Sequence, residues 1–491
     1  MCLWRPRVRF GGWISFGKLL PWGRAAVLGS GLLVLAACAG GARDVAPPKP
    51  QTQRPPAAAP TVPVPSAPTS TLQAPAPAAP ALAPNQLILG ITAAAPTAAP
   101  AGSPAAAPRP AQDALGLARV GLLVPLTGPS ANVGQALMNA AQMALFDVAD
   151  ERFVLQVYDT QGTPEGAAQA AGQAMAHGAR LLLGPLFSAE VKAVAPLASA
   201  ASVNMVVFST DPTVASNHVF VLGFLVQEQV RQILGYAKTQ NLSRLAVLAP
   251  NSAYGQAAVE AVNRYAPARG LRVTQVVFYD PDGKNLNDVV RRLAVYDQRK
   301  RALEQQKAEL TGKDDEISQL ALKRLGRLET VGEVDFDAIL IPDQGTRLTQ
   351  AATLLPFFDI DPGRVQLLGT LLWDTPGLGR EPVMIGGAYP APAQDSNRQF
   401  FARYREFYGR TAPSIATHGY DAVALAAILA RTGGRFSSEA VAANSGFAGV
   451  DGIFRFTPDG LSQRGFAVMQ VTRDGATVVQ PPPATFDAAQ F

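Results

Sequence analysis

From residue 119 onward, short apolar runs alternate with longer Ala-rich stretches. The run VGLLVPL at 120–126 carries no charged or hydrogen-bonding side chain, which predicts a strand buried on both faces. The same pattern predicts strands at 153–159, 180–184 and 205–209, with helices at 131–149, 164–177 and 188–201. Because strands and helices alternate at short spacing, the pattern predicts βαβ units and a parallel sheet.

A second series of the same kind begins near residue 219. Its predicted strands lie at 220–224, 244–250, 273–280, 336–342 and 365–369, and a further apolar run lies at 383–388. Its predicted helices lie at 226–240, 254–268, from about 285, and at 346–358. We expect later segments to return to the first series, namely helices 397–408 and 416–432 and strand-like stretches near 450–456 and 466–472. The sequence therefore predicts an α/β protein with two lobes around a cleft.

A charged segment at about 297–333 interrupts the second series. Residues 297–329 hold 15 charged side chains of both signs, and leucines recur at helical spacing in 319–329. These features predict an exposed helical hairpin on one lobe. Two interpretations stay open, a solvated insertion and an element that docks a partner through its leucine stripe.

Residues 1–37 have the pattern of a secretory signal. Residues 1–24 contain five basic and no acidic residues, and 25–37 form an apolar run shorter than the roughly 20 residues of a membrane-spanning helix. The run ends in Leu35-Ala36-Ala37-Cys38, which resembles the bacterial lipobox. The resemblance implies that the Cys38 thiolate receives diacylglycerol and anchors the mature chain facing the periplasm. Ala39 after the cysteine favours the outer membrane over the inner membrane.

A Pro- and Ala-rich segment, 38–113, follows the cysteine. Within it, residues 47–110 contain 18 Pro, 19 Ala and only three charged residues. Such a segment has too little apolar bulk to offset its ordering entropy, and repeated Pro favours an extended chain. We expect a disordered tether that leads to a folded body at 114–475 and a C-terminal tail at 476–491.

The distribution of charge narrows the class of partner. The whole chain has a formal net charge of +5, but residues 1–113 hold nine basic and two acidic residues. The remaining residues hold 33 basic and 35 acidic residues. The folded body is therefore not basic, and a nucleic-acid partner is not expected.

The residues that commonly carry catalysis or bind metals are sparse. The two cysteines are Cys2 and Cys38, and the three histidines, His177, His218 and His418, lie far apart in sequence. No G-x-S-x-G, H-E-x-x-H, Walker A or G-x-G-x-x-G motif occurs. The sequence therefore predicts a non-enzymatic protein with no catalytic residue, no cofactor and no metal site.

The body resembles the type I periplasmic-binding fold, in its leucine- and amino-acid-binding branch, over about 118–475. The resemblance is carried by VGLLVPLTGPSANVGQAL, LLLGPLFSAEVKAVAPLA, VVFSTDPTV and APNSAYGQAAVEAV, which begin at residues 120, 181, 206 and 249. It implies two lobes with parallel sheets, joined by crossover hinge segments.

The resemblance also implies a ligand site. In amino-acid-binding relatives, hydroxyls and helix N-termini after the third and fourth strands hold the ligand carboxylate. The matching positions here are Ser188, Ser209, Thr210 and Thr213, which are equally suited to capping helices. Tyr254 matches an aromatic residue that covers the ligand, and Trp373 lies on another expected cleft loop or in the core. Two departures stand out, because Asp211 replaces a small neutral residue and Asp374 is out of register with the carboxylate that binds the ligand amine.

Three further motifs look like those of penicillin-binding-protein activator lipoproteins. They are FDAILIPDQ from residue 336, LPFFDIDPGRVQLLGTLLWDTP from 355, and FFARYREFYGRTAPSIATHGYDAVALAA from 400. The resemblance implies a lipoprotein that binds and activates a peptidoglycan synthase. The best-known activators carry a helical-repeat domain before this fold, whereas residues 38–113 here are the tether.

Two hypotheses for the function follow. The first is a non-enzymatic envelope lipoprotein that regulates a penicillin-binding protein. The alternative is a solute receptor of an ABC transporter for leucine, other branched-chain amino acids or amides. A small amino-acid-like or peptidoglycan-derived ligand is compatible with either hypothesis.

Overall fold

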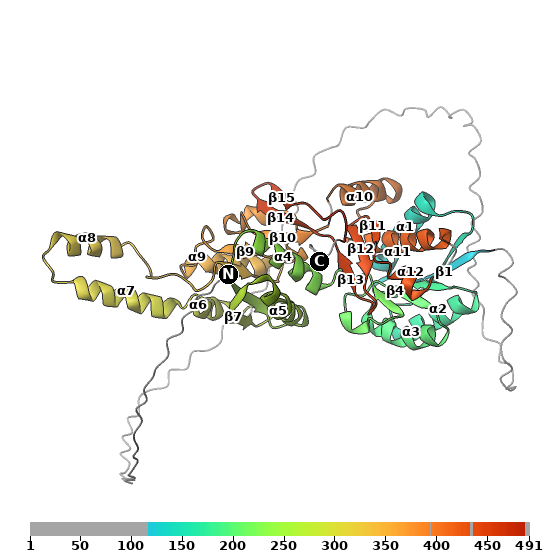
Figure 1. Ribbon diagram of the computed structural model, residues 1–491, viewed down its shortest axis with the longest axis horizontal. Helices are drawn as coiled ribbons and strands as arrows, with labels where there is room; N and C mark the ends of the chain where they lie inside the picture. The colour runs from blue at the N-terminus through green and yellow to red at the C-terminus, as the bar shows by residue number, and fades with distance from the viewer. Residues whose placement is uncertain (1–115, 393, 433–435, 487–491) are drawn as a thin grey trace, which may run out of the picture. The chain divides into compact units, whose positions relative to one another are not determined.

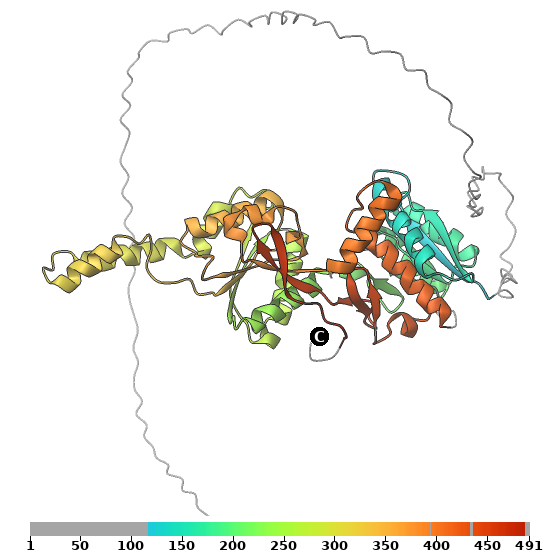
Figure 2. The same ribbon diagram turned by 90° about the horizontal axis from the view of Figure 1, so that it is seen from above.

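The computed structural model describes residues 116–486 except 393 and 433–435. The predicted signal peptide, the lipidation site Cys38 and the tether at 38–113 lie outside the described residues. The described chain forms two α/β lobes, as Figures 1 and 2 show, which confirms the predicted fold class.

The first lobe is built on a five-stranded parallel sheet in the order β2-β1-β3-β4-β5. Its strands are β1 (Ala118–Val124), β2 (Phe153–Asp159), β3 (Leu181–Leu183), β4 (Asn204–Val207) and β5 (Val219–Val221). Its early helices are α1 (Ala131–Val148), α2 (Pro164–Ala176) and α3 (Ser188–Ala200). Strand β1 contributes Val120, Leu122 and Val124 to one hydrophobic cluster and Leu123 to another. Both faces of the sheet are therefore covered, as the apolar run at 120–126 predicts.

The stretch near 466–472, which was expected to return to the first series, instead forms β14 (Ala467–Thr472) in the sheet of the second lobe. The other late segments complete the first lobe, as predicted. They are α10 (Gln394–Tyr408), α11 (Ala416–Arg431), α12 (Ser438–Val441), β11 (Phe447–Gly449), β12 (Gly452–Phe456) and β13 (Ser462–Arg464). Helices α1 and α11 pack closely where Gly419 faces Leu137. A Cβ at position 419 would lie only 2.3 Å from the Leu137 carbonyl oxygen, so this close approach requires glycine. The three short strands form their own antiparallel sheet, β11-β12-β13.

The second lobe contains a seven-stranded sheet in the order β15-β14-β10-β9-β8-β6-β7. Its strands are β6 (Arg244–Pro250), β7 (Arg272–Tyr279), β8 (Ala338–Leu340), β9 (Gln366–Leu368), β10 (Ala388–Ala391), β14 (Ala467–Thr472) and β15 (Gly475–Gln480). Its helices are α4 (Val226–Thr239), α5 (Ala253–Tyr265), α6 (Leu286–Leu293) and α9 (Gly345–Phe357). Strands β6 to β10 pair in parallel, whereas β14 and β15 are antiparallel to their neighbours.

Two expectations for the second lobe need correction. The strand at 220–224 was expected to begin the second series, but Val219–Val221 form β5, at the edge of the first-lobe sheet. An apolar run of this kind fits either sheet, and its pairing with β4 places it in the first lobe. The second correction concerns the expected tail at 476–491. Its first residues belong to β15, which pairs with β14 through a turn with Gly475 at φ +149°.

The charged insertion forms the predicted helical hairpin. Helix α7 (Tyr296–Leu310) runs away from the lobe and α8 (Glu316–Leu325) returns beside it. In Figures 1 and 2 both helices extend away from the second-lobe sheet. The hairpin lies between α6 and β8 in sequence, and so it branches off where the chain approaches the beginning of β8.

Arg464 joins two of the segments that pass from one lobe to the other. It ends β13, just before the chain crosses to β14, and its side chain is 1% exposed. Its Nη2 donates to the carbonyl of Leu222, 2.9 Å away, in the crossover from β5 to α4. The guanidinium also lies 4.8 Å from the ring centre of Phe224 in that crossover and 5.1 Å from that of Phe454. A buried cation is thus held between two aromatic faces and a carbonyl oxygen.

Buried acids surround this arginine. Asp421 Oδ2 lies 3.8 Å from Arg464 Nη1, and Asp421 Oδ1 accepts the amide N–H of Val450 at 2.7 Å. Asp451 accepts from Asn397 on α10 at 2.7 Å. Burial and the neighbouring carboxylate of Asp451 raise the pKa of Asp421 to about 7, against the attraction of Arg464. Two acids therefore face one buried cation, and Asp421 retains its proton more readily than an exposed carboxyl.

We expect Asp421 to make the fold less stable as the pH rises. From its ordinary pKa near 3.8 up to about 7, the folded chain keeps a proton that the unfolded chain releases, so stability falls across this window. The substitution Asp421→Asn removes this titration and leaves Asp451 to balance Arg464. The drop in the thermal midpoint between pH 5 and pH 7.5 should shrink by several degrees in the variant. Asp474→Asn, at an exposed turn, is the control, and equal drops in wild type and Asp421→Asn would contradict the expectation.

Candidate functional site

The four hydroxyl residues expected to bind a ligand in the first lobe lie around Asp211. Ser188 is the first residue of α3, Ser209 and Thr210 follow β4, and Thr213 lies in the 3-10 helix η2 (Pro212–Val214). The Asp211 carboxylate accepts the Thr213 amide at 2.9 Å and the Thr213 hydroxyl at 2.6 Å. The Ser188 hydroxyl also hydrogen-bonds to it, and Ser209 Oγ accepts the amide N–H of Asp211 at 3.1 Å. The loops after β3 and β4 thus come together as predicted.

The carboxylate of Asp211 is ionised at neutral pH. Partial burial alone would raise its pKa, but the bonds from Thr213, the charge of Lys192 and the bond from Ser188 together lower it. Lys192 Nζ lies 3.9 Å from Asp211 Oδ2, and its side chain is largely exposed. An anionic ligand at this position would meet a fixed negative charge, and two of the expected hydroxyl donors are already used. Thr210 is exposed and is free of such a bond among the described residues.

The beginning of α3 is also occupied by a carboxylate from the chain. The Glu190 side chain is fully buried, and its Oε2 accepts the amide N–H of Phe187 at 2.9 Å. The Thr160 hydroxyl and the Leu186 amide also donate to Glu190, although burial raises its pKa. Amide groups at a helix N-terminus can bind an anion, and here an internal carboxylate satisfies part of that capacity.

Tyr254, the expected aromatic cover, is held within the second lobe. It is the second residue of α5, and its hydroxyl donates to Gln229 Oε1 of α4 at 3.1 Å. The same oxygen accepts the amide N–H of Leu371 at 3.0 Å. Burial raises the pKa of Tyr254 to about 12, and a bond with Thr370 opposes that shift. Tyr254 as a whole remains partly exposed, although its hydroxyl is buried.

Trp373, the other expected second-lobe contact, lies in the hydrophobic core. It is fully buried in the 3-10 helix η4 (Leu371–Trp373), and its Nε1 donates to the carbonyl of Ile341 at 3.0 Å. The indole lies so close to Gly369 that a Cβ there would be 2.1 Å from it. Of the two readings that the sequence left open, the structure supports core packing. The neighbouring Asp374 accepts from Tyr389 at 3.2 Å, and burial raises the pKa of Asp374.

A cavity near the crossover includes one of the expected residues. It has a volume of about 310 Å³ and is lined by Thr213, by Leu225 and Gln227 before and in α4, and by Glu260 and Arg264 on α5, among others. Tyr254 and the other hydroxyl residues do not line it. The expected ligand residues are therefore divided between a loop centred on Asp211 and the interior of the second lobe.

Sequence reasoning missed Gln229, which links Tyr254 to the loop after β9. A glutamine on an amphipathic helix has no signature that separates a solvent-facing residue from a buried one. Asp211 was noticed as an unusual residue, but its partners could be identified only from the folded loop.

The described residues include no group of three or more His, Cys, Asp or Glu side chains that could hold a metal ion. Within the same residues, none of the helices has the length and apolarity that crossing a membrane requires.

Two lobes with parallel sheets and several crossovers define a binding-protein architecture of the periplasmic type. A family model for periplasmic binding proteins matches residues 118–476, and the chain belongs to that family.

Curated relatives match only part of this chain and part of their own length. An uncharacterized protein, RP748, from Rickettsia prowazekii is 24% identical over 176 residues, which are 36% of this chain and 47% of the relative. A Leu/Ile/Val-binding protein, BraC3, from Rhizobium johnstonii is 35% identical over 75 residues, 14% of this chain and 20% of the relative. The matches thus span less than half of either relative.

Solved structures share the fold at low sequence identity. A putative branched-chain amino acid ABC transporter structure from Rhodospirillum rubrum has a TM-score of 0.59 at 18% identity, covering 74% of this chain and 100% of that one. An ABC transporter substrate-binding protein from Sphaerobacter thermophilus has a TM-score of 0.52 at 18% identity, covering 76% and 100%. These similarities establish the fold alone.

We expect Trp373→Ala to destabilise the second lobe. The substitution removes a fully buried indole and its bond to Ile341, and large-to-small changes of this kind cost roughly 3–5 kcal/mol. Denaturant unfolding should show this loss, whereas Phe357→Ala, at a residue 69% exposed on α9, should change stability by less than about 1 kcal/mol. A small effect of Trp373→Ala would mean that the indole is not packed as described.

Proposed function

We propose that this protein is a non-enzymatic lipoprotein, anchored through Cys38 to the cell envelope, that binds and regulates a peptidoglycan synthase in the periplasm. The outer membrane is the proposed site of the anchor. In this proposal the body at 114–475 acts through contacts with protein, and the tether at 38–113 gives it reach from the membrane.

The observation that carries the proposal is the position of Asp211. An amino-acid receptor needs free donors for the ligand carboxylate, but Ser188 and Thr213 donate to the chain's own carboxylate. The ionised Asp211 would also repel an anionic ligand at short range. The fold is retained while its anion-binding loop is used internally, which favours a role in protein binding over solute capture.

Sequence features support a synthase as the partner. The segments from residues 336, 355 and 400 resemble those of penicillin-binding-protein activator lipoproteins, and the lipobox and tether fit an envelope protein. The resemblance covers segments of the folded body. The proposal therefore assigns regulation to the body itself.

A solute receptor is the second candidate. It is supported by membership of the periplasmic binding protein family and by the partial exposure of Tyr254. The ionised Asp211 would suit a ligand that carries a positive charge better than a free carboxylate. Such a receptor would serve an ABC transporter rather than a synthase.

The first test measures synthase binding directly. The full mature lipoprotein in detergent should co-purify with a class A penicillin-binding protein of the same bacterium and raise its rate of glycan polymerisation several-fold. Chain heated beyond unfolding is the control. An absence of both co-purification and stimulation would remove the proposed function.

The second test measures solute binding. Calorimetry and thermal-shift measurements with leucine, other branched-chain amino acids and amides should show no binding. If one of them raised the thermal midpoint by several degrees, and Tyr254→Ala abolished that rise, the protein would be a solute receptor. The inference drawn from Asp211, that its loop no longer captures a solute, would then be wrong. Phe407→Ala, at a residue 64% exposed on α10, is the matched aromatic control.

A further inference from the structure

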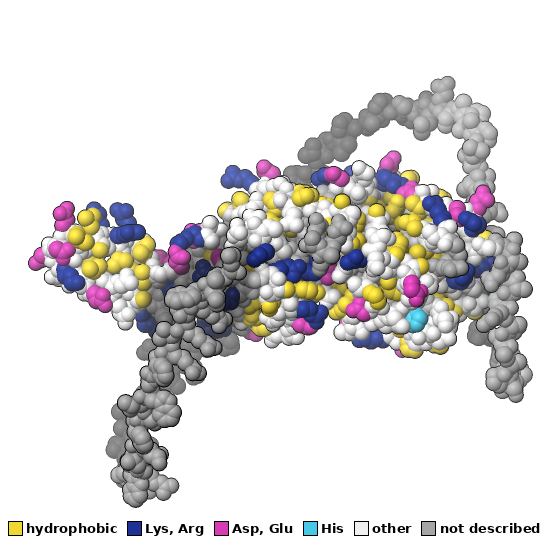
Figure 3. Space-filling view, viewed as in Figure 1, with side chains coloured by type: hydrophobic (Ala, Val, Ile, Leu, Met, Phe, Trp, Pro, Cys, Tyr) yellow, Lys and Arg dark blue, Asp and Glu magenta, His cyan; other side chains and the backbone are white. Residues whose placement is uncertain are grey.

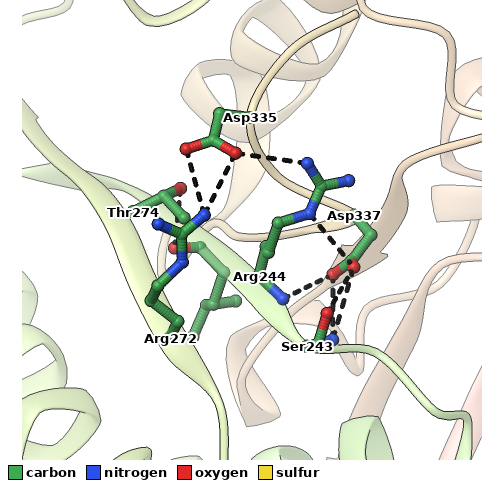
Figure 4. Close-up of polar contacts among 7 residues, drawn as sticks. Ser243, Arg244, Arg272, Thr274, Asp335 and Asp337 are labelled. Atoms are coloured by element: carbon green, nitrogen blue, oxygen red, sulfur yellow. Dashed lines mark hydrogen bonds and ion pairs between the residues drawn. The ribbon is translucent and has the colours of Figure 1, made fainter.

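The base of the α7–α8 hairpin is firmly attached to the second lobe. Figure 4 shows the returning segment held by two acids in front of β8. Asp335 pairs with Arg244 of β6 and Arg272 of β7, each at 3.2 Å. Asp337 accepts the Arg244 amide at 2.8 Å and the Ser243 hydroxyl at 3.1 Å. The end of the hairpin segment is therefore tied to the start of two neighbouring strands.

Arg299 holds the other side of the base. Its side chain, 11% exposed, lies on the first turn of α7 and pairs with Asp359 after α9 at 3.1 Å. It also donates to the carbonyls of Gly332 at 2.9 Å and Asp359 at 3.2 Å. Thr330 hydrogen-bonds to the same Asp359 carboxylate. These bonds fix the direction in which the hairpin leaves the lobe. A segment that served only as a solvated insertion would not need a fixed direction.

The outer part of the hairpin exposes apolar side chains. Ile317 and Leu320 on α8 are 80% and 61% exposed, and Leu328 after it is 44% exposed. Figure 3 shows apolar surface on the hairpin, bordered by charged side chains. Ile317 and Leu320 are one helical turn apart and so share a face of α8. Isolated exposed apolar residues are common, but a pair on one face of a projecting helix favours a contact surface.

The remainder of α8 and the turn after it are basic. Lys323, Arg324 and Arg327 follow the apolar pair, and none of the three forms an ion pair with any residue that the structure describes. The hairpin thus presents an apolar patch next to three unpaired positive charges. Its complement is an apolar surface with an acidic border.

A groove on the same lobe has this complementary character. It has a volume of about 660 Å³ and lies between the end of α9 and the segment at 381–385. Its apolar lining includes Pro356, Val383 and Ile385. Asp361 and Glu381 are its only charged lining residues, and neither has an ion-pair partner among the described residues. Ile385 is 41% exposed, so the groove is open to a ligand from solution.

We propose that α8 of one copy of this chain docks in the groove of a second copy. Ile317 and Leu320 would cover the apolar lining, while Lys323, Arg324 and Arg327 would approach Asp361 and Glu381. We call the groove lined by Pro356, Asp361, Glu381, Val383 and Ile385 the α9 groove. Both surfaces belong to the same chain, and both their apolar areas and their opposite charges match.

The location of the α9 groove lets this contact close into a two-fold dimer. Asp361 is two residues beyond Asp359, to which the hairpin base is bound, so the groove lies close to that base. Helix α7 has 15 residues and is about 22 Å long at 1.5 Å per residue. If the hairpins of two copies lie side by side and point in opposite directions, the outer part of each hairpin reaches the base of the hairpin in the other copy. The same contact then forms twice, which produces a closed pair rather than a filament.

This dimer does not depend on the proposed function. It would form whether the body regulates a synthase or binds a solute. Synthase binding and self-association are measured separately, and the failure of one leaves the other intact.

The test joins two differently tagged full-length chains in living cells. One chain carries Leu320→Cys and the other Val383→Cys, and mild oxidation should link them into a tagged heterodimer. Val478→Cys, at a residue 45% exposed on β15, replaces Val383→Cys as the matched control and should reduce the linked fraction at least five-fold. Equal linking with both positions, or no linking, would overturn the docking.

Charge reversal tests the ionic part of the contact. Arg324→Glu in the Leu320→Cys chain should lower the linked fraction at least five-fold, and Glu381→Arg in the other chain should restore it. Thermal midpoints within a few degrees of wild type would show that these exposed variants fold. A different result would overturn the proposal, namely that the two chains do not link and that Arg324→Glu abolishes co-purification with the synthase. The hairpin would then bind the synthase and not a second copy of this chain.

Discussion

The guanidinium of Arg464 is the interaction on which the arrangement of the chain depends. A fully buried cation is stable only where fixed oxygens and aromatic faces replace its water, and these come from Leu222, Phe224, Phe454 and Asp421. Leu222 and Phe224 lie in the first crossover, and Arg464 itself precedes another. If the crossover from β5 to α4 moved away from the crossover from β13 to β14, the Arg464 guanidinium would lose its partners while still buried, at a cost of several kcal/mol.

A second internal charge defines what the first lobe can bind. Loops after parallel strands, with hydroxyls and helix N-termini, form a general anion site. In this chain Asp211 and Glu190 provide the anions, and the donors of Ser188, Thr213 and Phe187 are used before any ligand arrives. A site of this kind keeps the geometry of a receptor loop but reverses the charge that it offers to solvent. The difference rests on a few side chains, which is why the fold alone does not identify a ligand.

The fold could be predicted from the sequence far better than the candidate site. Runs such as 120–126 and 244–250 are apolar throughout because parallel strands are covered on both faces, so their pattern is unambiguous. The strand at 220–224 was assigned to the wrong series because its apolar pattern does not indicate which sheet it joins. Hydroxyl positions were found from local motifs, but their hydrogen-bond partners depend on tertiary contacts. The buried state of Trp373 and the role of Gln229 likewise arise from residues distant in sequence.

The order of the strands has a consequence for how the chain folds. The sheet of the second lobe is completed by β14 and β15, and the core of the first lobe by α11 and the strands near 450, all from the last part of the sequence. Neither lobe is a continuous segment, so contacts between distant residues must form before either core closes. A chain that emerges from its N-terminal end therefore lacks part of the first-lobe core and two strands of the second-lobe sheet until these last residues are available. Completion of both lobes thus waits for the C-terminal region, the first lobe for residues up to Arg464 and the second for β14 and β15.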